Sequence, residues 1–141
     1  MALPPPEPGL VVNHAYLWHH ESEAGAAEGR KDRPSVIVLS VETRGGKTEV
    51  VVLPVTHRAP RAASAGVEIP AAVKRHLGLD DQRSWVIVAE GNVFTWPGFD
   101  LRPRRSGGYA FGFLPPNFFN RVRRAFVAYH AAHRPPLPRR D

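Results

Sequence analysis

Short apolar runs separated by turn residues dominate the chain and predict a β protein. The strongest runs are rich in β-branched and aromatic residues, as strands usually are: "LVVNHAYLW" (10–18), "PSVIVLSVE" (34–42), "EVVVLPVT" (49–56) and "RSWVIVAEG" (83–91). The second run is almost uninterrupted by polar residues, which predicts a buried strand. "TRGGKT" joins it to the third run as a hairpin turn, since glycine tolerates positive φ. "NVFTWPG" continues the fourth run after a kink at Gly91.

Two helices are expected beside these strands. After a short strand "VEIP", the segment "AAVKRHLGL" has Pro70 before its first turn and Gly78 where a helix cap belongs. "LPPNFFNRVRRAFVAYHAAHR" (114–134) predicts a C-terminal helix that Asn117 caps and Pro135 ends. Its apolar residues recur at helical spacing: Phe118, Phe119, Val122, Phe126 and Tyr129.

The order of these elements predicts a mainly β (α+β) fold. Five or so strands with tight turns favour a small, highly curved antiparallel sheet or barrel, with one short helix inserted and the C-terminal helix over one face. We expect a single domain over residues 9–133. A flexible proline-rich leader (1–8) precedes it, and a basic tail rich in proline and arginine (134–141) follows.

Composition narrows the classes of function. With 141 residues, 43% of them hydrophobic, the chain can bury one core, and the absence of cysteine excludes disulfides and thiol chemistry. No apolar run reaches the length of a membrane span and no signal peptide is evident, so we expect a cytoplasmic protein. The net charge is +6, and nine arginines but a single acid follow residue 101. That imbalance favours a polyanionic partner.

Candidate chemistry lies at strand ends. A charged cluster, "EGRKDR" (28–33), precedes the second strand, so Arg33 stands just before this strand, while Thr56 and His57 stand just after the third. Because a short turn makes these two strands antiparallel, the three residues should meet, and Glu28 can fold back toward them. The competing interpretation is a loop held by ion pairs, in which Arg33 pairs with Glu28 or Asp32.

A guanidinium, a hydroxyl, an imidazole and a carboxylate together suit cleavage of an RNA phosphodiester without a metal ion. The reaction needs a base for the 2′-hydroxyl proton, a cation at the phosphate oxygens and an acid for the leaving oxygen. Glu28 or His57 can serve as the base. The seven histidines suggest a metal site only weakly, because no acid or cysteine completes a set near His130 and His133. We therefore expect neither metal nor cofactor.

At these residues the sequence resembles the MazF/PemK family of toxins from type II toxin–antitoxin modules. The resemblance runs from Pro8 to Tyr129 and rests on "PGLVVNHAYLW", "EGRKDRPSVIVLS", "VVVLPVTHRAP", "SWVIVAEGNVFTWPG" and "LPPNFFNRVRRAF". Its most specific marks are the Arg-Pro step before an apolar strand and the Pro-x-Thr at the end of the next. The chain departs from the family pattern in its first strand, where "AYLWHH" lacks the usual acidic residue.

The resemblance implies an SH3-like, CcdB-like barrel that dimerises, cleaves single-stranded RNA without a metal and is inhibited by a cognate acidic antitoxin. It implies catalytic roles for Arg33, Thr56 and Glu28, with Arg30, Lys31 and Arg58 available for RNA phosphates. Phe94 and Trp96 in "FTWPG" are candidates for an apolar contact with the antitoxin, or else Trp96 closes the core.

Two alternatives stay open at this stage. One is a gyrase-targeting toxin of the CcdB type, which shares the fold and needs no Arg/Thr pair. The other is a degenerate, non-catalytic module of the same family that binds RNA or protein.

Overall fold

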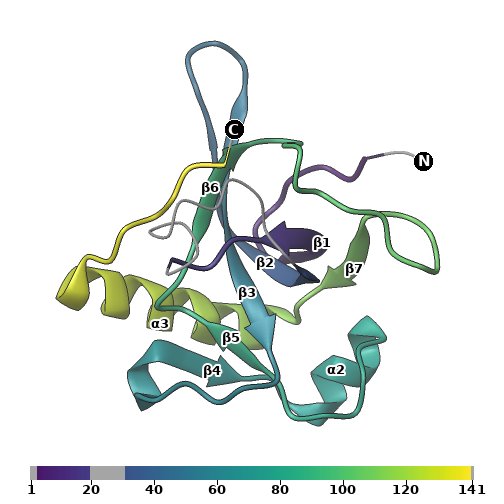
Figure 1. Cartoon of the computed structure of the whole chain (residues 1–141), viewed down its shortest axis with the longest axis vertical. Coiled ribbons are helices and arrows are strands. Elements are labelled where there is room, and N and C mark those ends of the chain that lie inside the picture. The colour runs from purple at the N-terminus through teal and green to yellow at the C-terminus, as the bar shows by residue number, and fades with distance from the viewer. Residues whose placement is uncertain (1–2, 20–30, 141) are drawn as a thin grey trace.

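A computed structural model describes residues 3–19 and 31–140. Figure 1 shows a curled antiparallel sheet with helices at its side and its lower end. The strands are β1 (Leu10–Tyr16), β2 (Lys31–Glu42), β3 (Thr48–Thr56), β4 (Gly66–Glu68), β5 (Trp85–Ile87), β6 (Asn92–Thr95) and β7 (Ala110–Phe113). The helical elements are a 3₁₀ turn η1 (Ala63–Ala65) and the α-helices α2 (Ala71–Leu77) and α3 (Pro116–His133). The predicted mainly β class is confirmed.

The long hairpin β2–β3 is the centre of the sheet. The strand order is β4-β5-β3-β2-β1-β7, and β6 pairs with β3 beside this path. β3 therefore pairs with β6 over Glu49–Val52 and with β5 at Val55 and Thr56. Pro54, which has no N–H to donate, lies where β3 passes from one of these partners to the other. The exchange of partners allows the small sheet to curl.

Both faces of the sheet are buried. On β3, Val51, Leu53 and Val55 face one cluster, while Val50 and Val52 face another. We call the cluster that contains the α3 residues the helix-side core and the other the second core. The predicted apolar face of α3 is confirmed, because Phe118, Val122 and Phe126 are buried in the helix-side core. Burying each such side chain contributes roughly 1.5–3 kcal/mol.

The helix limits agree in part with the sequence pattern. Gly78 caps α2 in the left-handed conformation at φ 70°, as expected for a helix C-terminus. The expected cap at Asn117 is wrong: α3 begins at Pro116, its N-cap position is Pro115, and no side chain caps it. Proline needs no cap partner in the first turn because it lacks the N–H group.

The strand limits also differ from expectation in three places. β2 begins at Lys31, which pairs with Tyr16, so Arg33 lies inside the strand rather than before it. The run 83–91 and its expected continuation form two separate strands, because the chain turns at Val88 and Ala89. β7, which pairs with β1, was not predicted from "AFGF". No helix in the described residues is both long and apolar enough to cross a lipid bilayer.

The basic C-terminal tail packs against the sheet. After α3 it returns to β6 and runs beside it (Figure 1), where Val93 donates its N–H to the Pro138 carbonyl and accepts from the Arg140 N–H. Arg140 is buried and donates from Nε to the Asp100 carboxylate at 2.7 Å, and Asp100 is itself buried. The neighbouring Arg139 instead pairs with Glu49 near the surface, at 3.0 Å.

The second core contains a buried histidine beside this tail. His14 has no exposed surface and stacks on Phe94, with ring centroids 5.0 Å apart. Burial, together with the positive charges of Arg140 and Arg102, lowers the pKa of His14 to about 3, although the Asn92 side chain acts in the opposite direction, so the ring is neutral at physiological pH. Phe94 is also buried, which excludes it as an exposed contact for a partner.

Replacing Arg140 by alanine should destabilise the protein by about 3–5 kcal/mol, because it leaves the Asp100 carboxylate buried without its cation. Arg139→Ala is the matched control. Its ion pair is partly solvent-exposed, so its loss should cost less than about 1 kcal/mol. Urea unfolding of both variants measures the difference. Equal effects, or no recovery of stability when Asp100→Asn is added to Arg140→Ala, would contradict the importance of this buried pair.

Candidate active site

A cavity of about 860 Å³ opens at the end of the sheet where β2 begins and β3 ends. Five of the residues expected to take part in function line it: Arg33, Thr56, His57, Lys31 and Arg58. Its wall also contains apolar side chains, among them Trp18, Leu79 and Ile87. The cavity therefore combines a basic rim with surfaces on which a planar group can pack.

The register of the hairpin explains why Arg33 and Thr56 share this cavity. Ser35 pairs with Pro54. If this antiparallel register continues for two more residues, Arg33 lies opposite Thr56. Directly opposite residues of antiparallel strands present their side chains on the same face. That face is the one on which Ile37 and Val52 enter the second core, so the two polar side chains continue an apolar row beyond its end.

Arg33 is held by contacts on two sides. Its Nη1 donates to the Val55 carbonyl at 3.5 Å, and its guanidinium carbon lies 5.0 Å from the Trp18 ring centroid. A guanidinium packed on an indole gains a cation–π attraction and loses rotational freedom. A cation fixed in this way could bind an anion with little reorganisation.

Thr56 and Arg58 interact through the backbone. The Arg58 N–H donates to the Thr56 hydroxyl oxygen at 3.2 Å. Because the hydroxyl oxygen accepts this bond, its own hydrogen can still be donated to a ligand. The Arg58 side chain is exposed, and so is Lys31 at the start of β2.

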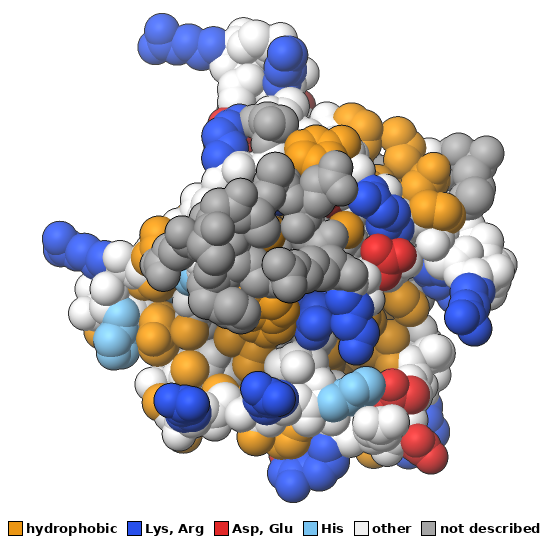
Figure 2. All heavy atoms as spheres, in the orientation of Figure 1, with side chains coloured by type: hydrophobic (Ala, Val, Ile, Leu, Met, Phe, Trp, Pro, Cys, Tyr) orange, Lys and Arg blue, Asp and Glu red, His pale blue; other side chains and the backbone are white. Residues whose placement is uncertain are grey.

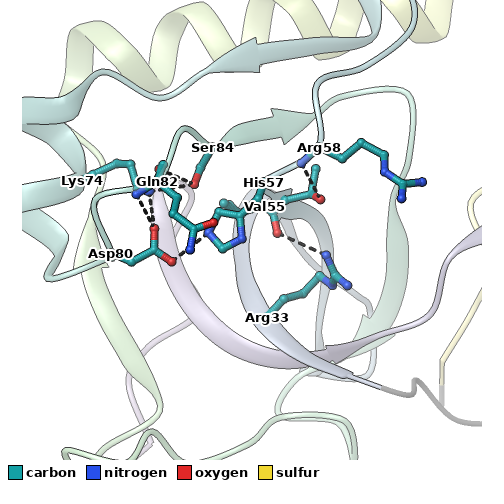
Figure 3. A network of polar contacts seen from close by, with 9 residues as sticks. Arg33, Val55, His57, Arg58, Lys74, Asp80, Gln82 and Ser84 are labelled. Atoms are coloured by element: carbon teal, nitrogen blue, oxygen red, sulfur yellow. Dashed lines mark hydrogen bonds and ion pairs between the residues drawn. The ribbon is translucent and has the colours of Figure 1, made fainter.

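His57 belongs to a polar network that sequence reasoning missed (Figure 3). Its Nε2 lies 2.7 Å from Asp80 Oδ2, and Asp80 Oδ1 accepts from the Lys74 ammonium, also at 2.7 Å. Lys74 donates further to the Ser84 hydroxyl at 2.8 Å and to the Gln82 carbonyl. Partial burial acts to raise the pKa of Asp80, but the hydrogen bonds from Lys74 and His57 outweigh it and hold that pKa below its usual value.

A second carboxylate, Glu90, also lines the cavity and was not predicted. It accepts from the Tyr16 hydroxyl at 3.0 Å and from the His19 N–H at 3.2 Å. Burial and the neighbouring Glu90 carboxylate together raise the pKa of Tyr16 well above its ordinary value, so the phenol stays protonated. Glu90 thus ties the end of β1 to the turn between β5 and β6.

Two of the expected site residues, Glu28 and Arg30, lie outside the described residues. On the face seen in Figure 2, Lys and Arg side chains outnumber acidic ones, in line with the net charge of +6. Within residues 3–19 and 31–140, no three side chains of His, Cys, Asp or Glu gather closely enough to hold a metal ion.

Comparison with known proteins adds one finding about the fold. One solved structure, described as an endoribonuclease in complex with its cognate antitoxin from a mycobacterial species, is similar to this chain with a TM-score of 0.54. The alignment covers 98% of this chain and 100% of that one, at 16% sequence identity. No family model and no curated protein matches the sequence. At this identity the similarity establishes a shared fold.

Proposed function

We propose that the protein is the toxin of a type II toxin–antitoxin module and acts as a metal-independent endoribonuclease on single-stranded RNA. The observation that carries this proposal is the cavity at the end of the β2–β3 hairpin, which Arg33, Thr56 and His57 line together. The likeness in fold to an endoribonuclease and the sequence resemblance to MazF/PemK toxins support it.

The proposed reaction is an in-line attack within the RNA chain. A base removes the proton of a 2′-hydroxyl, the 2′-oxygen forms a bond to the adjacent phosphorus, and the bond from phosphorus to the 5′-oxygen breaks. The leaving 5′-oxygen takes a proton from an acid. The products are a 2′,3′-cyclic phosphate and a 5′-hydroxyl, with no net gain or loss of protons.

The side chains of the cavity match the demands of this reaction. Negative charge grows on the phosphate oxygens in the transition state, and Arg33 can donate two parallel hydrogen bonds to them. Thr56 contributes a third donor. We favour Glu28 as the base, with His57 as the alternative. Arg30, Lys31 and Arg58 would bind phosphates on either side of the reacting one.

We further propose an acidic antitoxin as partner and a homodimer as the active form. The similar solved structure is an endoribonuclease bound to its cognate antitoxin, which supports the first part. A partly disordered acidic segment that folds on binding would place its carboxylates where RNA phosphates bind. Of the two aromatic candidates in "FTWPG", Trp96 is the accessible one, half-buried against the second core, and we propose it as a contact for such a segment.

Cleavage of single-stranded RNA tests the proposed reaction. The purified chain should cleave in the presence of EDTA and leave 2′,3′-cyclic phosphate and 5′-hydroxyl ends. Arg33→Ala should slow cleavage about 10²-fold or more, the usual effect of removing a preorganised charge stabiliser. Arg44→Ala serves as the matched control, since Arg44 is an exposed arginine in the turn of the β2–β3 hairpin, away from the cavity.

Three outcomes would reject parts of this account. Loss of activity in EDTA, or 5′-phosphate products, excludes the mechanism. Equal rates for Arg33→Ala and Arg44→Ala exclude Arg33 as the charge stabiliser. Binding of RNA without any cleavage by the wild-type chain leaves the degenerate binding module as the better interpretation.

Competition between RNA and an acidic peptide tests the proposed partner. A synthetic peptide rich in aspartate and glutamate should bind more weakly as salt rises and should displace a fluorescent single-stranded RNA, because both compete for the same cations. Light scattering on the same samples gives the mass of the free chain, which should be that of a dimer. Simultaneous, independent binding of both ligands, or a monomeric mass throughout, would contradict the proposal.

A further inference from the structure

Asp80 links the cavity to a buried lysine in the middle of α2. It lies in the loop between α2 and β5 and binds His57 through one carboxylate oxygen and Lys74 through the other, each at 2.7 Å. The oxygen that binds Lys74 also accepts the Gln82 N–H at 3.1 Å. The carboxylate is thus fixed from the protein side, although the Asp80 and His57 side chains are each about half exposed (48% and 49%).

Lys74 is what holds Asp80 in place. Its side chain is 5% exposed, and its ammonium is surrounded by three acceptors: Asp80, the Gln82 carbonyl and the Ser84 hydroxyl. An ammonium has three hydrogens to donate, so this set satisfies it fully. A buried lysine also needs a counter-charge, and Asp80 is the carboxylate bonded to it. Asp80 therefore stays ionised at neutral pH while it faces His57.

We propose that Asp80 is a positioning residue that orients His57 for proton transfer in the cavity, and that Lys74 holds Asp80 for this task. The inference rests on the proposed ribonuclease function. The sequence motifs that resemble the toxin family include Arg33 and Thr56 but not Asp80.

The geometry determines which ring nitrogen of His57 faces the substrate. In the neutral ring, Nε2 carries the hydrogen and donates it to Asp80, so Nδ1 keeps its lone pair and can take the proton of a 2′-hydroxyl. In the protonated ring, Nδ1–H can give its proton to the leaving 5′-oxygen. Either role uses the same orientation, and Asp80 itself gains no proton in either. Without Asp80, a half-exposed histidine just beyond the end of a strand would sample several rotamers.

The expected effect of losing the carboxylate follows from the hydrogen bond to His57. A carboxylate only accepts, so it keeps the hydrogen of the neutral ring on Nε2, whereas the amide of Asp80→Asn can donate to Nε2 and so favour the ring with its hydrogen on Nδ1. The other charged groups that line the cavity are Lys31, Asp32, Arg33, Arg58, Arg61, Lys74 and Glu90.

A purely structural role for Asp80 would look different. If Asp80 only neutralised Lys74, its loss would lower stability and leave the tautomer of the His57 ring unchanged. Ser84→Ala separates the two roles, because it removes a partner of Lys74 and leaves the His57–Asp80 contact in place. Asp81→Asn is the matched control for charge, since Asp81 is the adjacent exposed acid and does not line the cavity.

The test compares single-turnover RNA cleavage by wild type, Asp80→Asn, Asp81→Asn, Ser84→Ala, His57→Ala and the double variant Asp80→Asn/His57→Ala. We expect Asp80→Asn to slow cleavage about tenfold, because the His57 ring is no longer held in one tautomer and one orientation. Asp81→Asn should stay within about twofold of wild type. The double variant should be no slower than His57→Ala, because Asp80 acts through His57.

Additive losses in the double variant would overturn the inference while leaving the nuclease intact. A nitrogen NMR spectrum of the His57 ring needs no RNA. At a pH where the ring is neutral, wild type and Asp81→Asn should carry the hydrogen on Nε2 and Asp80→Asn should shift toward Nδ1, and identical spectra would reject the coupling. If the wild-type chain cleaves no RNA, the proposed function fails, and the spectrum alone then decides whether Asp80 controls His57.

Discussion

The pairing of β2 with β3 is the interaction on which the candidate site depends. From Ser35 paired with Pro54 to Ile37 paired with Val52 the register is constant, and it shifts by one residue only beyond Ile37, at a bulge before Leu39. A slip of one residue would turn the Arg33 side chain to the opposite face of the sheet, away from Thr56. The alternation of Val50, Val51, Val52 and Leu53 between two buried cores makes such a slip costly.

The site is assembled from rigid elements around that pair. The Arg33 guanidinium packs on the ring of Trp18, which follows β1. The loop between α2 and β5 places Asp80 beside His57. Val73 and Leu77 anchor α2 in the helix-side core. The backbone of Lys74, whose ammonium holds Asp80, is therefore fixed in position. Packing in the core therefore determines the orientation of polar groups at the cavity, as preorganised charge stabilisation requires.

Much of this architecture follows from local patterns in the sequence, and the remainder depends on contacts between distant residues. The three long strands, the cap at Gly78 and the buried face of α3 are each encoded within a few neighbouring residues. The proximity of Arg33 and Thr56 follows from a single short turn. The sequence around Asp80, by contrast, is that of an ordinary solvent-exposed acid in a loop. Only the tertiary fold places Asp80 next to His57, which lies 23 residues earlier in the chain.

Two further features had no local signal. The strand β7 is four residues long and contains Gly112, so propensity favours it only weakly. The sequence of the tail shows only a basic segment rich in proline and arginine. In the structure Arg140 is buried, because the carboxylate of Asp100, 40 residues earlier in the chain, pairs with it. Glu28 and Arg30 belong to a segment outside the described residues, so their places in the site remain predictions.

A structure of the protein with a short RNA whose reacting 2′-hydroxyl is replaced by hydrogen would test the central claim most directly. This replacement removes the attacking group and leaves the phosphates unchanged. The account predicts one phosphate within hydrogen-bond distance of both the Arg33 guanidinium and the Thr56 hydroxyl, with His57 facing its 2′ or 5′ side. An RNA bound elsewhere, for example along the arginines of α3 with the cavity empty, would contradict it.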